Sequence, residues 1–244
     1  MSAIVAIPAR LKSSRFPNKM LLDVKGKKLV NHVYDVCKKN KLFHNIYLAT
    51  CDKILEIIAK KNNANVIKTS VSHQDCISRV IEAVKKLKKT IKKDDHIVIV
   101  QGDEACITSA ILDNFCKIIN KYRYDYYNLV SKIDLKKDFF SPSVIKCAIN
   151  DKNEIIFMTR HPIPFNKSNK LKIFKTYRQT GVIAFTKKSL LKYSKLNQNY
   201  FEKYESIDML RVLESGFKIC SFKTKKRMIG LDTKSDYKEL KKIL

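Results

Sequence analysis

Short apolar segments alternate with helical patterns through the first half of the chain. The segments lie at residues 2–7, 45–50, 65–69 and 96–100, and the last, HIVIV, is apolar on both faces until it ends at Gln101. Strands that are buried on both faces are typical of parallel sheets whose connections are helices. The pattern therefore predicts an α/β protein with a three-layer α/β/α arrangement and a mostly parallel sheet.

The segments between these strands have apolar residues at helical spacing. Helices are expected at 29–39, 53–62, 77–89 and 110–122. In the second of them Ile54, Ile57 and Ile58 are predicted to form the face that packs on the sheet.

The second half of the chain has a different pattern. Strands are expected at 143–150, 153–159 and 179–186, separated by loops rather than helices. This spacing predicts an antiparallel arm within about 125–190, for sugar binding or dimerisation. One helix over 204–216, a strand over 218–223 and a terminal helix follow. Since no repeat or linker interrupts the chain, residues 1–244 are expected to form a single domain.

The formal charge of +27 raises the possibility of nucleic-acid binding. Of the 50 basic residues 42 are Lys and only 8 are Arg, and the lysines are scattered in pairs instead of forming one stripe with aromatic residues between them. This distribution favours a solvated basic surface without a specific nucleic-acid partner. A non-catalytic basic nucleic-acid-binding protein remains the alternative from a different class.

The seven cysteines include no C-x-x-C pair, which argues against structural zinc and predicts reduced thiols. No apolar run approaches the roughly 18 residues of a membrane span, and no signal peptide is evident. We therefore expect a soluble, cytoplasmic protein without membrane insertion.

Arginine is scarce, so the positions where it occurs are informative. Arg offers a planar fork for phosphate or carboxylate that Lys does not reproduce. Six of the eight arginines fall in stretches that resemble site loops or their flanks: Arg10, Arg15, Arg79, Arg160, Arg178 and Arg211.

The stretch IPARLKSSRFPNKML places cations and hydroxyl groups directly after the first strand. Its polar residues are Arg10, Ser13, Ser14, Arg15 and Lys19. Ligands of open α/β sheets bind beyond the carboxyl ends of the strands, so this loop is predicted to hold a polyphosphate. It lacks the Walker A pattern, and the alternative interpretation is a basic surface loop.

Carboxylates occupy two comparable positions. Asp103 follows the strand at 96–100 in VQGDEACI, and Asp232 precedes the terminal helix in GLDTKSD. Both are candidate ligands of Mg²⁺, which prefers oxygen ligands and substrate phosphates. The alternatives are a turn cap for Asp103 and an ordinary helix N-cap for Asp232. His73 and Arg79 stand at the entrance of the helix at 77–89, where an anion would be favoured.

These stretches, taken in order, resemble the 3-deoxy-manno-octulosonate cytidylyltransferase (CMP-Kdo synthetase) family. The opening stretch resembles IPAR-x-x-S-x-R-x-P-x-K-x-L, and VQGDEACI resembles V-Q-G-D-E-P-x-I. Further matches are ATCDKI, SPSVIKC, TRHPIPF, ESIDMLRVLESGFKI and GLDTKSDYKEL, so that the resemblance runs from Ala3 to about Leu240.

The resemblance implies a nucleotide-diphospho-sugar transferase-like fold and a reaction. CTP and a 3-deoxy-2-ulosonic acid, Kdo or a close relative, would give the CMP-sugar and pyrophosphate with Mg²⁺, in a cytoplasmic homodimer that serves lipopolysaccharide or capsule synthesis. By matching positions Arg10, Arg15 and Lys19 would hold the triphosphate, and Asp103 and Asp232 would hold Mg²⁺. The catalytic residues would be Arg10, Lys19 and Asp103. The expected substrate-binding residues are Arg10, Ser13, Ser14, Arg15, Lys19, His73, Arg79, Gln101, Arg160, Gln179, Glu205 and Asp208.

The chain departs from the family pattern at three places. Asp75-Cys76-Ile77-Ser78 replaces Ser-Gly-Thr-Glu, Gln179 replaces a histidine, and Asp208 replaces a glutamate. These departures leave open which ulosonic acid and which base are used. A sugar nucleotidyltransferase with a different acid or base is therefore a further alternative.

Overall fold

The computed structural model describes residues 3–13, 15–87, 91–92, 95–167 and 176–243. Its strands are β1 Ala3–Ala9, β2 Asp23–Val24, β3 Lys27–Lys28, β4 Phe43–Thr50, β5 Val66–Lys68, β6 His96–Val100, β7 Tyr126–Lys132, β8 Lys146–Ile149, β9 Glu154–Thr159, β10 Tyr177–Thr186 and β11 Ile219–Thr224. Its helices are the 3-10 helix η1 Lys19–Leu21 and α1 Leu29–Lys38, α2 Lys53–Lys61, α3 Cys76–Lys86, α4 Ser109–Lys121, α5 Lys136–Phe140, α6 Lys187–Tyr193, α7 Tyr200–Glu205, α8 Leu210–Glu214 and α9 Lys234–Ile243.

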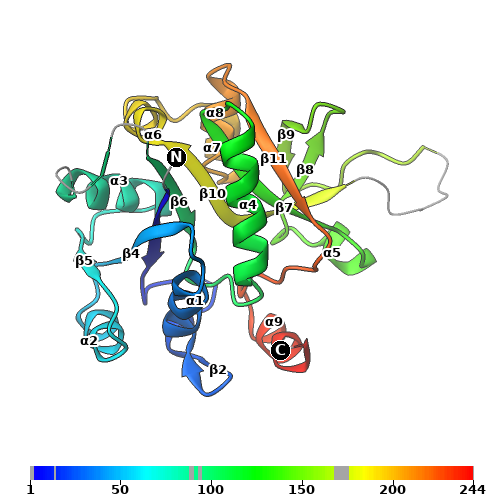
Figure 1. The fold of residues 1–244 in the computed structure, drawn as a ribbon. Coiled ribbons are helices and arrows are strands. Elements are labelled where there is room, and N and C mark those ends of the chain that lie inside the picture. Colours follow the sequence, from blue (N-terminus) through cyan, green and yellow to red (C-terminus); the bar gives the residue numbers. More distant parts are fainter. Residues whose placement is uncertain (1–2, 14, 88–90, 93–94, 168–175, 244) are drawn as a thin grey trace.

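A central mixed sheet organises the described part of the chain (Figure 1). Its strand order is β5-β4-β1-β6-β10-β7-β11-β9-β8. β5, β4, β1 and β6 are parallel, and so are β7 and β11. β10 lies between these two groups and pairs antiparallel with both β6 and β7. The predicted α/β class is confirmed. The sheet is less parallel than expected, because β10, in the middle of the sheet, runs antiparallel to both of its neighbours.

The antiparallel arm expected at 125–190 is present only in part. β8 and β9 pair antiparallel at the end of the sheet, and the first residues of β10 pair with β8. The remainder of β10 and all of β7, a strand that the sequence analysis did not predict, lie in the central sheet. The arm is therefore a short hairpin that continues the main sheet.

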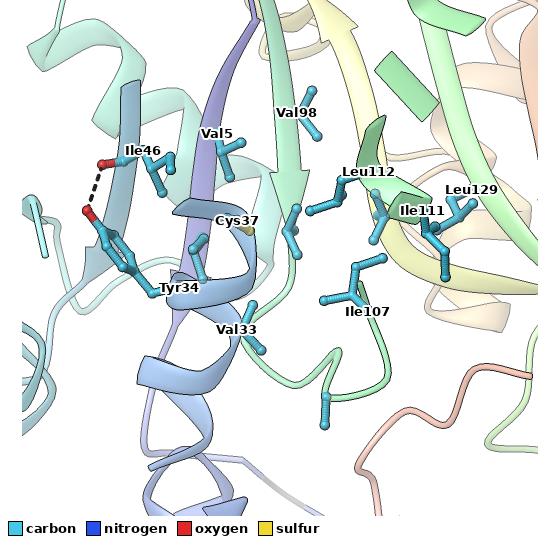
Figure 2. Packing of buried hydrophobic residues seen from close by; sticks show 14 of the residues in the cluster. Val5, Val33, Tyr34, Cys37, Ile46, Val98, Ile107, Ile111, Leu112 and Leu129 are labelled. Atoms are coloured by element: carbon cyan, nitrogen blue, oxygen red, sulfur yellow. Dashed lines mark hydrogen bonds between the residues drawn. The ribbon is translucent and has the colours of Figure 1, made fainter. Parts of the chain in front are cut away.

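Helices cover both faces of the sheet, as the three-layer expectation required. Alternate residues of β1 point to opposite faces. Val5 and Ile7 pack in a cluster with residues of α1, α2 and α4, part of which Figure 2 shows. Ile4 and Ala6 pack in a second cluster with residues of α3, α6 and α8. Burial on both sides explains why β1 is apolar at every position from Ala3 to Ile7.

The predicted apolar face of α2 is wrong in part. Ile54 and Ile57 are 52% and 44% exposed, while Leu55 and Ala59 are buried against the sheet. Ile58 lies at the edge of the same contact. The pair Leu55 and Ala59 has the same helical spacing as Ile54 and Ile58. The spacing of apolar residues was therefore compatible with either face of α2. In the structure the face with Leu55 and Ala59 is the buried one.

The helix expected over 204–216 is two helices with a corner between them. α7 ends at Glu205, the following C-cap residue Ser206 adopts a left-handed backbone conformation with φ 51°, and α8 begins at Leu210. Asp208 therefore lies in the corner between the two helices. In a continuous helix it would have been on a helix face.

Two structural findings concern membrane-spanning helices and the cysteines. No helix in the described ranges is long and apolar enough to cross a membrane. All seven cysteines are free, and five of them are buried.

Replacement of Leu55 by Ala is predicted to lower the free energy of unfolding by about 2–4 kcal/mol, because it removes buried apolar surface and leaves a cavity. Ile54→Ala, one position away and half exposed, is the matched control and should cost less than about 1 kcal/mol. Urea denaturation followed by circular dichroism measures both. Equal losses in the two variants would contradict the observed orientation of α2.

Candidate active site

One cleft of about 570 Å³ lies at the carboxyl ends of β1 and β6. Its walls come from the loops after these strands, the beginning of α3, the first half of β10, the α7–α8 corner and the loop before α9. This is the position where open α/β sheets bind ligands, and the volume is typical of small-molecule sites.

Lys19 is the centre of the cleft's charge arrangement. The side chain is buried, and its Nζ contacts a carboxylate oxygen of Asp103 and lies 3.5 Å from Oδ1 of Asp232. It also donates a hydrogen bond of 2.8 Å to the carbonyl oxygen of Leu231. Burial lowers the pKa of Lys19, but the contact with Asp103 and the nearby charge of Asp232 outweigh that effect, so the pKa is raised. Lys19 therefore stays charged throughout the physiological pH range.

Asp103 and Asp232 come from opposite ends of the chain and meet at this one ammonium group. Arg15 contacts Asp232 from the solvent side, with 3.0 Å between the guanidinium and Oδ1. The two carboxylates thus face one volume of the cleft, as the sequence analysis expected of a metal site. Among the described residues no group of three or more His, Cys, Asp or Glu side chains could hold a metal. Two carboxylates suit Mg²⁺, which commonly takes its other ligands from water and substrate phosphates.

The predicted polyphosphate loop lines the same cleft. Arg10, Ser13, Arg15 and Lys19 all contribute to its wall. Ser14 lies outside the described residues. The guanidinium of Arg10 donates to the carbonyl oxygen of His73 at 3.4 Å, which connects the loop to the segment before α3. The structure therefore brings together four of the five residues proposed for this loop.

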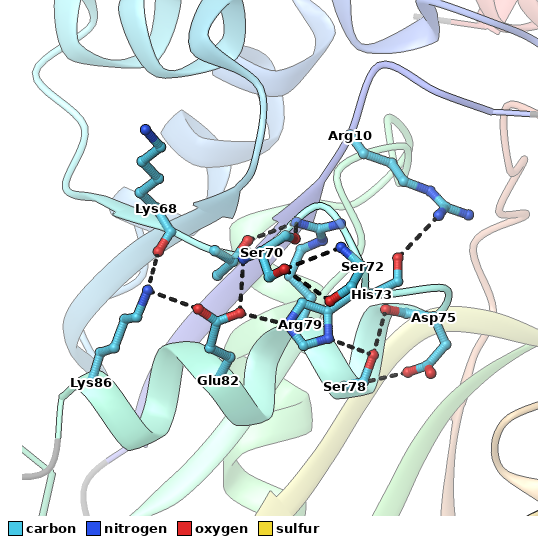
Figure 3. Close-up of polar contacts among 11 residues, drawn as sticks. Arg10, Lys68, Ser70, Ser72, His73, Asp75, Ser78, Arg79, Glu82 and Lys86 are labelled. Atoms are coloured by element: carbon cyan, nitrogen blue, oxygen red, sulfur yellow. Dashed lines mark hydrogen bonds and ion pairs between the residues drawn. The ribbon is translucent and has the colours of Figure 1, made fainter.

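His73 is not among the residues that line the cleft, and its contact with substrate stays a prediction. Figure 3 shows its ring between Ser78 and Glu82, with Nε2 2.5 Å from a Glu82 oxygen and Nδ1 3.2 Å from the Ser78 hydroxyl. Arg79 lines the cleft, but it is almost fully buried and donates to Thr69 Oγ1 at 2.6 Å. Both residues fix the segment that precedes α3.

Asp75 caps α3 by accepting a hydrogen bond of 2.6 Å from the backbone N–H of Ser78. The next residue, Cys76, places its side chain in the cleft, where its Sγ accepts from Gln101 Nε2 at 3.2 Å and lies 3.6 Å from Asp208 Oδ2. Burial, Asp75 and Glu202 raise the pKa of Asp208 to about 7. Gln101 and Asp208 are thus brought together through a cysteine that the sequence analysis treated only as a departure.

Arg160 and Gln179 line the cleft from the hairpin side. The Gln179 amide donates to Asn128 Oδ1 at 2.9 Å, which fixes its orientation. Glu205 does not reach the cleft. It accepts from the Thr159 hydroxyl and from the backbone N–H of Arg160, and so holds the end of β9 to α7. Its contact with the sugar acid stays a prediction.

Sequence reasoning did not assign a role to Glu104, although it directly follows Asp103. Its side chain is buried in the cleft wall and accepts a hydrogen bond of 2.5 Å from the backbone N–H of Gly181. Its second oxygen, Oε2, has no partner among the described residues. Burial, and next the charge of Asp103, raise the pKa of Glu104 to about 7.

Two further residues, Glu202 and Arg178, line the cleft without having been assigned a binding role from the sequence. Glu202 pairs with Arg211 through two hydrogen bonds of 2.7 and 2.6 Å, and Arg178 lines the opposite wall. The scarcity of arginine had already drawn attention to Arg178 and Arg211, although without a specific role for either. No sequence signal separated Glu202 from the many other acidic residues on helices.

The fold and this cleft define a nucleotidyltransferase-like α/β protein. The chain superposes on 4-diphosphocytidyl-2C-methyl-D-erythritol synthase with a TM-score of 0.67 and 12% identity, over 99% of this chain and 98% of that one. A structure of CMP:2-keto-3-deoxy-manno-octonic acid synthetase complexed with CTP superposes with a TM-score of 0.88 and 25% identity, over 100% of this chain and 98% of that one.

Sequence comparison resolves the family. A sequence model of the family described as Cytidylyltransferase matches residues 4–222. A 3-deoxy-manno-octulosonate cytidylyltransferase of Francisella tularensis subsp. tularensis (strain FSC 198) is 34% identical over 98% of this chain and 97% of its own length. One of Thermodesulfovibrio yellowstonii is 29% identical over 100% of this chain and 98% of its own length. The chain belongs to the cytidylyltransferase family.

Glu104→Gln is predicted to become more stabilising as pH rises. The pKa of Glu104 is about 7 in the folded protein, whereas the usual value is 4.5. Between these two pH values the folded state binds more protons than the unfolded chain. The free energy of unfolding of the wild type therefore falls as pH rises. Gln keeps the oxygen that accepts from Gly181 and has no proton to lose. The free energy of unfolding of the variant, relative to that of the wild type, should rise by on the order of 2 kcal/mol between about pH 5 and about pH 8, as measured by urea denaturation. A constant difference would contradict the raised pKa.

Proposed function

We propose that the protein activates a 3-deoxy-2-ulosonic acid, Kdo or a close relative, with CTP, and releases the CMP-sugar and pyrophosphate. The observation that carries this proposal is the meeting of Lys19, Asp103 and Asp232 in one cleft, with Arg10 and Arg15 on the adjacent wall. Membership of the cytidylyltransferase family and the similarity to a structure complexed with CTP support the choice of reaction.

In this reaction the anomeric hydroxyl oxygen of the sugar acid forms a bond to the α-phosphorus of CTP, while the bond from that phosphorus to pyrophosphate breaks. The contribution of the protein is to position the two reactants and to neutralise charge. Arg10, Arg15 and Lys19 would bind the triphosphate. Lys19 would be the most effective of the three, because it is buried and its ammonium is already oriented.

Asp103 and Asp232 would hold Mg²⁺ together with phosphate oxygens. When bound, the ion would neutralise the negative charge that builds up on the phosphates. In the described structure Lys19 contacts both carboxylates, so that this volume already favours positive charge.

The sugar acid would bind between the beginning of α3 and the hairpin side of the cleft. Gln101, Arg160, Gln179 and Asp208 line this part. Amide and carboxyl groups at this end provide donors and acceptors for sugar hydroxyls. The replacements at Cys76, Gln179 and Asp208 make a relative of Kdo as reasonable a substrate as Kdo itself. The protein would act in the cytoplasm. The CMP-sugar that it releases would be used for the synthesis of a surface polysaccharide, either lipopolysaccharide or capsule.

A screen for pyrophosphate release tests this proposal. The four nucleoside triphosphates are each combined with a panel of 3-deoxy-ulosonic acids, with and without Mg²⁺. Turnover is expected with CTP, an ulosonic acid and Mg²⁺ together. Turnover with another base or acid would favour the alternative nucleotidyltransferase, and the absence of turnover in every combination would refute the enzyme proposal.

Asp103→Asn is predicted to reduce kcat by at least about 100-fold, because it removes a charge that would hold the metal beside the reacting phosphates. Asp151→Asn, at an exposed turn outside the cleft, is the matched control and should retain full activity. Urea denaturation of both variants verifies that they fold. A folded Asp103→Asn variant with near-normal kcat would remove Asp103 from the metal site.

We also propose that the protein is a homodimer. Phe157, Tyr200, Phe201 and Tyr204 form an aromatic patch on β9 and α7, in which Phe157 packs on Phe201 and Tyr200 packs on Tyr204. Tyr200 and Tyr204 are 64% and 75% exposed. A second copy of the chain would bury this surface.

Sedimentation velocity over a range of concentrations tests the dimer. Tyr204→Asp is predicted to shift the protein to monomer because it places a charge in the apolar contact, whereas Tyr122→Asp, at an exposed site elsewhere, should not. Wild type that stays monomeric, or a dimer that Tyr204→Asp does not weaken, would contradict the proposed interface.

A further inference from the structure

The thiol of Cys76 lies between two cleft residues that come from distant parts of the chain. Gln101 directly follows β6, and Asp208 is in the corner between α7 and α8. The Gln101 amide donates from Nε2 to Cys76 Sγ at 3.2 Å, and the thiol donates to Asp208 Oδ2 at 3.6 Å. Burial, and next the charge of Asp208, raise the pKa of Cys76, so the thiol keeps the proton that it donates. One side chain therefore connects an amide and a carboxyl group of the cleft wall.

The backbone on both sides of the contact between Cys76 and Asp208 is held in place. The carbonyl oxygen of Asp208 accepts a hydrogen bond of 3.1 Å from the Tyr193 hydroxyl, and the next residue, Met209, is buried. Cys76 is the first residue of α3, and Ile77, which follows it, is fully buried. Neither segment can move away from the other without disturbing the core, so the lengths of the two side chains have to match.

The Gln101 amide is confined on the side opposite to Cys76. A Cβ at Gly181 would lie 2.8 Å from both Cβ and Oε1 of Gln101. The backbone N–H of Gln101 also donates to the carbonyl oxygen of Gly181 at 2.9 Å. The amide thus lies between the backbone of β10 and the thiol, and its orientation depends on both.

Cys76 and Asp208 are two of the positions where the chain departs from the family pattern, which has a glycine and a glutamate there. A glutamate at 208 would extend its carboxylate by one more C–C bond, about 1.5 Å. Since Sγ of Cys76 and Oδ2 of Asp208 are already in contact at 3.6 Å, a longer side chain in the same direction would overlap the sulfur. The larger residue at one position accompanies the shorter residue at the other. Packed sites tolerate such volume-conserving exchanges better than a change of one partner alone.

We propose that Cys76 is a specificity-determining residue matched to Asp208: its thiol takes the space of a longer carboxylate and positions Gln101 and Asp208 toward the sugar acid. The inference rests on the proposed function, in which these two neighbours bind the acid. Cys76 acts through them and not on the reacting atoms, so it is a positioning residue. The acid that fits this cleft is one that meets a short carboxyl group and a fixed amide.

The contacts of Cys76 favour a role toward the acid over a role toward the triphosphate. Two of the cations proposed for the triphosphate, Arg15 and Lys19, gather at Asp232. The two hydrogen bonds of Cys76 instead join it to residues of the wall where the acid is proposed to bind.

A double-replacement cycle of Cys76→Ala and Asp208→Glu tests the match by steady-state kinetics. Asp208→Glu alone should raise the KM for the ulosonic acid at least about 10-fold, because the longer carboxylate meets the thiol. In the Cys76→Ala background the same replacement should raise that KM less than about 3-fold, because the sulfur is gone. Alanine is the strongest helix former, so α3 should stay folded. An equal effect of Asp208→Glu in both backgrounds would overturn the proposal.

Two further readouts separate positioning of the acid from a general structural loss. The KM for CTP should change less than about 2-fold in the same variants. Cys76→Ser, which keeps a donor and an acceptor, should raise the KM for the acid less than Cys76→Ala does. Cys51→Ala, at the other cysteine that is not buried and outside the cleft, is the matched control and should retain wild-type kinetics. A rise in the KM for CTP alone would assign Cys76 to the nucleotide and refute the proposal.

The last arm does not require turnover. Calorimetric titration measures the Kd of each acid of the ulosonic acid panel for wild type, the two single variants and the double variant. If the cycle appears in the Kd of an acid while wild type shows no turnover with CTP, the proposed function fails and the role of Cys76 stands. If Asp208→Glu weakens binding equally in both backgrounds, or if wild type binds no acid of the panel, the role of Cys76 is refuted.

Discussion

The contact of Lys19 with Asp103 and Asp232 is the interaction on which the site depends. It joins the loop after β1, the loop after β6 and the segment before α9, which are more than 200 residues apart along the chain at their extremes. A buried ammonium between two carboxylates is stabilising only while all three groups are present. The geometry therefore specifies one arrangement of these loops, and it places positive and negative groups where a triphosphate and its metal ion would be bound.

The fold was predictable to the extent that burial alone determines sequence pattern. β1, β4 and β6 were identified because residues buried on two faces must be apolar, and the order of strands and helices followed from them. β7 was missed even though six of its seven residues are buried, since its Asn128 and Ser131 break the apolar run. Asn128 is satisfied by donating to the carbonyl oxygens of Thr180 and Val182 in β10, a long-range pairing that no local pattern reveals.

The sequence indicated many of the residues that line the cleft, but it did not indicate which side chains of each loop point into it. Arg10, Lys19, Asp103 and Asp232 were found because each follows a strand or precedes a helix at the same edge of the sheet. His73 and Glu205 are close in sequence to cleft residues, yet each turns toward a partner outside the cleft: Glu82 for His73 and Thr159 for Glu205. Proximity along the chain identifies a loop, whereas the available hydrogen-bond partners decide which side chains of that loop face the ligand.

The residues at the α3 end of the cleft restrain one another. Gln101 is held from one side by Cys76 and from the other by the backbone at Gly181, where a Cβ would lie 2.8 Å from the Gln101 side chain. Cys76 also contacts Asp208, and burial together with Asp75 and Glu202 brings the pKa of that carboxyl group to about 7. Near neutral pH Asp208 therefore exists both as a hydrogen-bond donor and as an acceptor, while Gln101 has a fixed orientation. In the proposed reaction a sugar acid would meet one rigid amide and one carboxyl group whose protonation can adapt, and a change at Cys76 would alter both at once.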